Sequence, residues 1–284
     1  MYRRTTNTNR RGRGGLSLGR ILVALVIAAI SLIGYFASSE FNPITGETQQ
    51  VALSQNEEIA MGLQAAPEMA QMHGGLLSDK EQQAHLDKVC SRLVNNSEAS
   101  QTEWPFECHL LADDQTINAF ALPGGQLFIT AALYNELETE GQLAGVMAHE
   151  IGHVVARHAA EQIAEQQLAQ GLSGAAVIAA YDPENPESGL TVQQMSALIS
   201  HLVTLKYGRG DELQSDQLGV QFMAEAGYDP QALIQVMEIL AAAGGPRSQP
   251  EFFSTHPNPE NRIERIREAI TAVYPDGVPE NLEP

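Results

Sequence analysis

Apolar residues recur at helical spacing along much of the chain, and the clearest case is the segment 142–167. This segment is rich in Ala, Glu, Gln and Leu and has no proline, so it predicts one continuous helix. Its periodic positions predict a buried face, made of Leu143, Val146, Met147, Ile151, Val154 and Val155. Further helices are predicted near residues 55–72, 79–95, 211–226, 230–242 and 259–272.

Polar residues mark the starts of two of these helices. Ser54 with Glu57, and Ser78 with Glu81, stand at the spacing of a capping box. In such a box each side chain bonds the other residue's backbone N–H. The helices near 55–72 and 79–95 are therefore expected to begin at these serines.

Between residues 106 and 130 the pattern changes to short runs of strand formers. One strand is predicted near 106–111. Two more runs, 117–122 and 126–130, flank the turn residues Pro123, Gly124 and Gly125, which predicts a β-hairpin. The expected fold class is α+β, mainly helical, in one domain long enough for a sizeable core.

An uncharged apolar run at residues 21–37 follows a basic segment, 1–20, that holds six arginines and no acidic residue. As a helix the run is roughly 25 Å long, enough to cross a bilayer with little tilt. It predicts a transmembrane anchor. Because Ala37, Ser38 and Ser39 are small, a cleaved signal segment is the alternative. The positive-inside rule keeps the arginines in the cytoplasm and exports everything after Ser38.

The charge of the remaining chain is strongly negative. The formal net charge is −19, and without the six N-terminal arginines residues 21–284 carry −25. Such a body is not expected to bind nucleic acid or anionic lipid through charge. Its two cysteines, Cys90 and Cys108, would lie in an oxidising compartment, but the sequence leaves their pairing open.

The motif His149-Glu150-Ile151-Gly152-His153 carries the strongest chemical signal. On a helix, residues four apart project from one face, so both imidazoles can reach one metal ion. Glu150 then lies beside a metal-bound water, which is the arrangement of zinc peptidases. The alternative is a pair of core histidines on an amphipathic helix.

A third ligand is expected from a second helix, because a catalytic zinc takes three protein ligands and keeps one position open. Glu212 is the candidate, and Asp216 stands one helical turn after it. Asp216 would accept the other ring N–H of a zinc histidine and fix its orientation. Without the first motif, such an acidic pair would be read as a solvated helix face.

Four motifs together resemble the M48 family of zinc metallopeptidases. They are N-A-F-A-L-P-G-G-Q-L-F-I-T at 118–130, H-E-I-G-H-V-V-A-R-H at 149–158, E-L-Q-S-D at 212–216 and S-T-H-P-N-P-E-N-R-I at 254–263. The similarity runs from about residue 45 to 272 and looks closest to small bacterial forms with one membrane segment. Where relatives often read R-E-x-E-x-E-A-D, this chain has Arg209-Gly210-Asp211-Glu212-Leu213-Gln214-Ser215-Asp216.

The resemblance implies a zincin-type domain with its small sheet beside the H-E-x-x-H helix, and one Zn²⁺ per chain. It assigns His149, His153 and Glu212 to the metal, Glu150 to the general base and Asp216 to support of a ligand. It also places His256 and Arg262 at the metal site as catalytic residues. His256 or Arg262 would be an oxyanion donor, or His256 would be a fourth ligand that blocks water. The alternative for His256 is a residue at the start of the 259–272 helix.

Substrate binding is expected at the first strand of the hairpin, residues Asn118, Ala119, Phe120 and Ala121. In similar peptidases an edge strand pairs with the substrate backbone, although a purely structural hairpin fits this sequence equally well.

The expected substrates are polypeptides, namely unfolded or misassembled exported proteins. The expected function is a zinc endopeptidase of the bacterial inner membrane that faces the periplasm and acts in quality control. A catalytically idle member that serves as a chaperone or scaffold is the alternative.

The remaining segments complete the domain map. Residues 38–53 are expected to be a linker, 54–273 the peptidase domain and 274–284 a frayed acidic tail. Residues 171–207 hold two apolar pieces too short to span a membrane, which predicts a helical hairpin beside the cleft. This hairpin could be a lid, or it could touch the bilayer or an oligomer partner.

Overall fold

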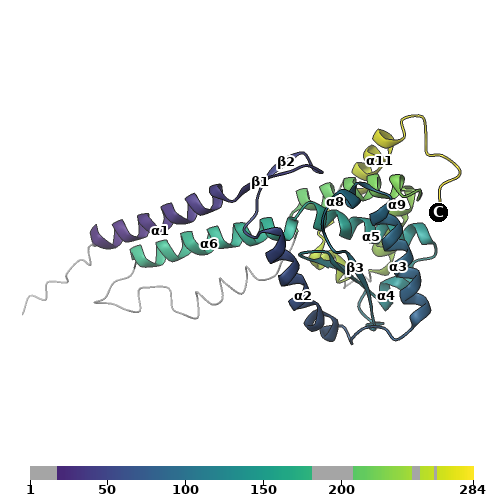
Figure 1. Cartoon of the computed structure of the whole chain (residues 1–284), viewed down its shortest axis with the longest axis horizontal. Helices are drawn as coiled ribbons and strands as arrows, with labels where there is room; N and C mark the ends of the chain where they lie inside the picture. The colour runs from purple at the N-terminus through teal and green to yellow at the C-terminus, as the bar shows by residue number, and fades with distance from the viewer. Residues whose placement is uncertain (1–17, 181–206, 245–249, 259–260) are drawn as a thin grey trace, which may run out of the picture. The chain divides into compact units, whose positions relative to one another are not determined.

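The computed structural model describes residues 18–180, 207–244, 250–258 and 261–284 (Figure 1). The chain divides into two compact units, one of Met1–Ala37 with Glu165–Thr204 and one of Ser38–Ala164 with Leu205–Pro284. The second unit holds every motif found in the sequence. Most of residues 190–207, predicted as the second half of a helical hairpin, lies outside the described residues.

The first unit contains helix α1, Leu18–Ala37, and the C-terminal part of α6, His158–Ala180. Among the described residues α1 is the helix long and apolar enough to cross a membrane, by length and composition. Its apolar side chains are largely exposed. The predicted apolar segment thus forms a helix, with three more residues at its start.

The second unit is built around a three-stranded sheet of order β3-β5-β4. Strand β3 (Glu107–Leu111) runs parallel to β5 (Gln126–Thr130), and β4 (Ala119–Leu122) pairs with β5 as an antiparallel hairpin. The predicted strand and hairpin are both confirmed. Gly124 in the hairpin turn has φ +81°, and a Cβ there would overlap the backbone of Ile59, so only glycine fits the turn.

The two faces of the sheet pack on different helices. Phe120 and Phe128 stack with a ring separation of 4.9 Å and face α2 (Gln55–Met72) through Ala70 and Met69. The alternate residues of the strands face the main core, which contains α3 (Lys80–Asn95) and α5 (Glu140–Val155). In Figure 1 strand β3 lies between these two helical layers.

Helix α5 is the centre of the core, and all its residues after Glu140 are buried. Helix α8 (Arg209–Glu225) packs closely along it: a Cβ on Gly152 would stand 2.7 Å from Ser215 Oγ, and Ser215 Oγ donates to His149 O at 2.5 Å. The core is completed by α9 (Gln231–Ala243), α11 (Arg262–Val273) and three short helices, α4 (Ala131–Glu136), η1 (Glu98–Gln101) and α10 (Phe252–Thr255).

The single helix predicted over 142–167 is wrong, because the chain breaks between α5 and α6. Arg157 has φ +58°, the left-handed region that side chains other than glycine rarely adopt. Backbone acceptors at the break are bonded by side chains from elsewhere: Asn42 donates to Val155 O at 2.8 Å and Gln49 to Ala156 O at 2.6 Å. Tertiary contacts therefore override the local helical preference.

Those two side chains belong to a β-hairpin in the segment expected to be a linker. Strands β1 (Ser39–Asn42) and β2 (Glu47–Gln50) pair in antiparallel fashion, and Asn42 and Gln49 are buried at 7% and 3% exposure. Residues 38–53 are thus more ordered than a linker. Through Asn42 and Gln49 the hairpin contacts the break after α5.

Two further expectations were wrong in detail. The cap of α3 is Asp79, not Ser78: its carboxylate accepts from Glu81 N and Gln82 N, whereas Ser54 and Glu57 do form the predicted box. The C-terminal residues are not frayed, because Glu283 N donates to Gly227 O at 3.0 Å and Gly141 N donates to Pro284 O at 2.8 Å.

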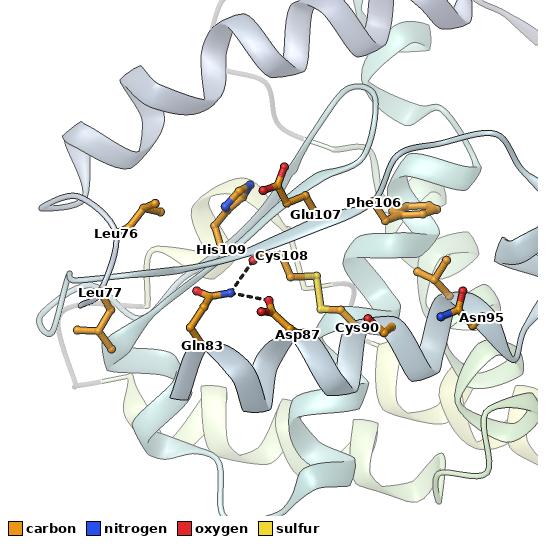
Figure 2. Close-up of a pocket in the computed structure, with 12 residues that line it drawn as sticks. Leu76, Leu77, Gln83, Asp87, Cys90, Asn95, Phe106, Glu107, Cys108 and His109 are labelled. Carbon is orange, nitrogen blue, oxygen red and sulfur yellow. Dashed lines mark hydrogen bonds between the residues drawn. A yellow bond between two sulfur atoms is a disulfide. The ribbon is translucent and has the colours of Figure 1, made fainter. Parts of the chain in front are cut away.

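A disulfide joins Cys90 on α3 to Cys108 on β3, with an S–S distance of 2.10 Å. The pairing that the sequence left open is therefore formed. Figure 2 shows the bridge beside Gln83, whose amide nitrogen donates to Cys108 O at 2.8 Å. Because Gln83 Oε1 also accepts from Leu110 N, this side chain occupies the outer edge of β3.

Candidate metal centre

Three parts of the chain bring four potential metal ligands together. His149 and His153 come from α5, Glu212 from the first turn of α8, and His256 from the residue after α10. One ligand atom from each lies within 4.8 Å of the others. All four side chains are buried, at 0–2% exposure. The structure therefore brings the three predicted metal residues together with His256, which the resemblance also placed at the metal site.

The spacing of the donor atoms fits one metal ion. His149 Nε2 lies 3.1 Å from His153 Nε2 and 3.3 Å from His256 Nδ1. Glu212 Oε1 lies 3.4 Å from His153 Nε2 and 3.1 Å from His256 Nδ1. Ligand atoms that share one tetrahedral zinc at about 2.0–2.2 Å stand roughly 3.3–3.6 Å apart. The residues present thus match the size of a site for such an ion.

Glu150 lies next to this cluster and is fully buried. Neither of its carboxylate oxygens has a hydrogen-bond partner among the described residues. His256 Nε2 lies 3.6 Å from Glu150 Oε1. Burial raises the pKa of Glu150, so this carboxyl group holds a proton more readily than an exposed one.

Asp216 and Arg262 contact the side chains of the cluster: Asp216 contacts His149, and Arg262 contacts Glu212. Asp216 Oδ1 is 2.9 Å from His149 Nδ1, as predicted for a residue that orients a ligand. Arg262 donates to both oxygens of Asp216, at 2.7 and 2.9 Å, and its third nitrogen lies 3.0 Å from Glu212 Oε2. Burial alone would raise the pKa of Asp216, but Arg262 and His149 lower it.

The imidazoles of the cluster differ in their titration. Burial lowers the pKa of His153 well below its usual range, so its ring is neutral, the form that binds metals. Burial acts in the same direction on His149, but its bonds to Asp216 and Glu212 raise the pKa to about 9.

Sequence reasoning missed three residues that wrap this cluster. Tyr207 stacks on His153 with a ring separation of 3.8 Å, and Phe252 stacks on His256 at 4.4 Å. His158 Nδ1 lies 2.8 Å from His153 Nδ1. His158 ends the ten-residue motif, which was the available signal; Tyr207 and Phe252 carry no pattern that points to a metal.

The predicted substrate strand reaches the cluster at one end. Ala121, Leu122 and Pro123 line a small hollow together with His153 and Tyr207. Its volume of about 10 Å³ is room for about one water molecule. Asn118 Oδ1 is buried without a hydrogen-bond partner among the described residues, and Phe120 faces α2 instead of the cluster.

A larger hollow of about 580 Å³ lies at the opposite edge of the sheet, beside β3 and the disulfide (Figure 2).

Comparison with known proteins relates the chain to peptidases. The profile described as "Peptidase family M48" matches residues 80–270, which include all four motifs. The beta-barrel assembly-enhancing protease of Escherichia coli (strain K12) is 31% identical over 268 residues, 91% of this chain and 54% of that protein. The mitochondrial metalloendopeptidase OMA1 of Schizosaccharomyces pombe is 32% identical over 237 residues, 82% of this chain and 67% of that protein. The chain spans about half the length of the bacterial relative.

Proposed function

Since the chain belongs to peptidase family M48, as its motifs predicted, we propose that it is a zinc-dependent endopeptidase acting on exported proteins. One observation carries the proposal: four buried donor atoms converge within 4.8 Å, with an unpaired carboxylate, Glu150, beside them. The expected class, a metallopeptidase domain with a mainly helical α+β fold, is confirmed. The metal, the residue roles and the substrates are proposed.

Buried charge supports a divalent cation. Glu150, Glu212 and Asp216 are three buried carboxylates, and Arg262 is the guanidinium that contacts two of them. The four groups leave two negative charges when all are ionised, and burying uncompensated charge is costly. A zinc ion held by His149, His153 and Glu212 would neutralise them, and nitrogen with carboxylate donors suits zinc.

We assign the chemistry of peptide hydrolysis to Glu150. Zinc, when bound, makes a coordinated water more acidic and polarises the scissile carbonyl. Glu150 is placed to take the proton from the attacking water and to pass it to the leaving amine. Burial raises the pKa of Glu150, and a carboxylate with a raised pKa is a stronger base toward the attacking water.

The roles of the residues around Glu150 follow from their contacts. Asp216 orients His149, and Arg262 compensates the charge of Asp216 and Glu212, since its guanidinium is held by both. His256 provides a fourth donor, which describes a resting state in which the position of the attacking water is taken. Cleavage then requires the His256 segment to move away, after which its imidazole is free to serve as an oxyanion donor.

Substrate is proposed to pair with the outer edge of β4. Asn118 O accepts from Thr130 N at 3.0 Å, so Asn118 bonds inward to β5. By the alternation of an antiparallel ladder, the backbone groups of Ala119 and Ala121 point to the other side. Pairing through backbone groups gives affinity with little sequence demand, which suits unfolded substrates. The edge of β3 is less suited, because Gln83 already covers it.

We propose a cellular location for the protein from helix α1 and from the positive charge of residues 1–20. The helix acts as an anchor, and the six arginines of residues 1–20 keep the N-terminus in the cytoplasm, so the peptidase unit faces the periplasm. The name of the E. coli relative, a beta-barrel assembly-enhancing protease, supports envelope proteins as substrates. A mature chain that begins near Ser38 would instead indicate a cleaved signal segment.

The test is cleavage of an unfolded protein by the purified full chain in detergent. Casein is incubated with the chain as purified, after chelation, and after chelation followed by stoichiometric zinc. The proposal predicts cleavage that chelation abolishes and zinc restores, with one zinc per chain by elemental analysis. A chain that binds one zinc but cleaves casein neither as wild type nor as His256→Ala is instead a non-catalytic binding protein.

A further inference from the structure

A line of hydrogen bonds leads from the candidate ligand His153 to the protein surface. His153 Nδ1 lies 2.8 Å from His158 Nδ1, and His158 Nε2 lies 2.8 Å from Gln214 Oε1. Gln214 Nε2 donates in turn to Glu47 Oε2 at 2.9 Å. His153 and His158 are buried, Gln214 is half-buried and Glu47 is exposed.

The far end of this line fixes the direction of every bond in it. An ionised carboxylate only accepts hydrogen bonds, so Gln214 must turn its NH₂ group to Glu47 and its oxygen to His158. His158 must then carry its proton on Nε2, which leaves Nδ1 as an acceptor. His153 consequently carries its proton on Nδ1, and its Nε2 lone pair points at His149 and Glu212.

The helix break at Arg157 allows the first hydrogen bond of this line, between His153 and His158, to form. Five residues of a continuous helix turn the chain through about 500°, so side chains at 153 and 158 would point about 140° apart. The left-handed residue at 157 brings the His158 ring back to His153. The hairpin of β1 and β2 both holds this break, through Asn42 and Gln49, and supplies Glu47.

We propose that His158, Gln214 and Glu47 are positioning residues that hold His153 as the Nδ1–H tautomer, with Nε2 ready to bind the metal. The inference rests on the proposed zinc site. Partners of this kind around a metal histidine fix the ring and make the coordinating nitrogen more basic. The β1–β2 hairpin, which follows α1 directly, is thereby connected to the ligand shell.

Zinc affinity of the full chain in detergent, measured by competition with a chromophoric chelator, tests the inference. His158→Leu removes the acceptor at similar volume and is expected to weaken zinc binding by about 10- to 100-fold. His158→Gln keeps an acceptor oxygen and should recover much of the loss. Gln214→Leu should weaken binding by a smaller factor, and Gln217→Leu, an exposed position on the same helix, should leave it unchanged.

A second measurement separates positioning from a merely structural role. The metal-free thermal midpoint of each variant is recorded beside its zinc affinity, and ¹⁵N spectra of histidine-labelled chain report which ring nitrogen of His153 carries the proton. The inference predicts Nδ1–H in the wild type and a loss of affinity larger than any loss of metal-free stability accounts for. If Gln214→Leu and His158→Leu bind zinc as the wild type does, the inference is wrong although the zinc site stands. A wild-type chain without zinc affinity overturns both.

Discussion

Replacing Arg157 by methionine should destabilise the peptidase unit mainly through one buried carboxylate. Arg157 contacts Glu58 Oε1 at 2.6 and 2.8 Å, and Glu58 is 2% exposed. Its other ion pair, to Glu40 at 2.8 Å, involves a side chain that is 59% exposed and contributes less than about 1 kcal/mol. Removing one partner of a buried pair costs about 3–5 kcal/mol, so Arg157→Met should lose about 3 kcal/mol at pH 8.

The loss should depend on pH with a definite sign. Burial raises the pKa of Glu58 to about 7, against the lowering effect of Arg157. A carboxyl pKa raised on folding contributes stability that is fully present below its unfolded value and is lost as pH rises through about 7. At pH 5.5 Glu58 is protonated and needs no counter-charge. The difference between Arg157→Met and wild type should therefore shrink to about 1 kcal/mol, that of a lost hydrogen bond.

The assay is thermal unfolding of wild type, Arg157→Met and Arg157→Met/Glu58→Gln at both pH values. A loss of about 3 kcal/mol corresponds to roughly 6–12 °C in a unit of this size. The double variant should recover most of it at pH 8, because no buried charge is left unpaired. A single-variant loss that is equal at both pH values, or a double variant no more stable than the single one, would refute the reasoning.

Three further outcomes are expected. Glu212→Gln should lower zinc occupancy well below one per chain, and full occupancy by elemental analysis would remove it from the ligands. His256→Ala should raise basal casein cleavage if the imidazole blocks the water position, or lower it about 10- to 1000-fold if it is an oxyanion donor; no change would exclude both roles. Gly124→Ala should lose at least about 2 kcal/mol in thermal unfolding, because it meets the Ile59 backbone at φ +81°. Gly75→Ala, with φ +87° but open space, should lose about half as much, and equal losses would contradict the packing argument.

Features encoded over short stretches of sequence were predictable. The spacing of His149 and His153 on one helix, with buried apolar residues around them, needs only the helical period. The hairpin at residues 119–130 needs only two apolar runs and a Pro-Gly-Gly turn. Glu212 could be chosen because a second acidic residue, Asp216, follows one turn later. In each case the local preference and the tertiary structure agree.

Features that depend on distant contacts were not predictable. Nothing near Arg157 marks a helix end, since the carbonyls of the two residues before it are bonded by Asn42 and Gln49, more than a hundred residues earlier. The predictions for residues 38–53 and for the C-terminal tail were wrong for the same reason, namely contacts with distant residues. In the tail, for example, Glu283 N donates a hydrogen bond to Gly227 O. Likewise, His158 reaches His153 only because the helix breaks between them.

The central claim is that Glu150 performs the proton transfers of peptide hydrolysis and is not itself a zinc ligand. The direct test is Glu150→Gln in the full chain, with zinc content and casein cleavage measured on the same preparation. Glutamine keeps the shape of the side chain but removes the base, so we predict one zinc per chain and cleavage lowered by about two orders of magnitude or more. Full zinc content with undiminished cleavage would contradict the account.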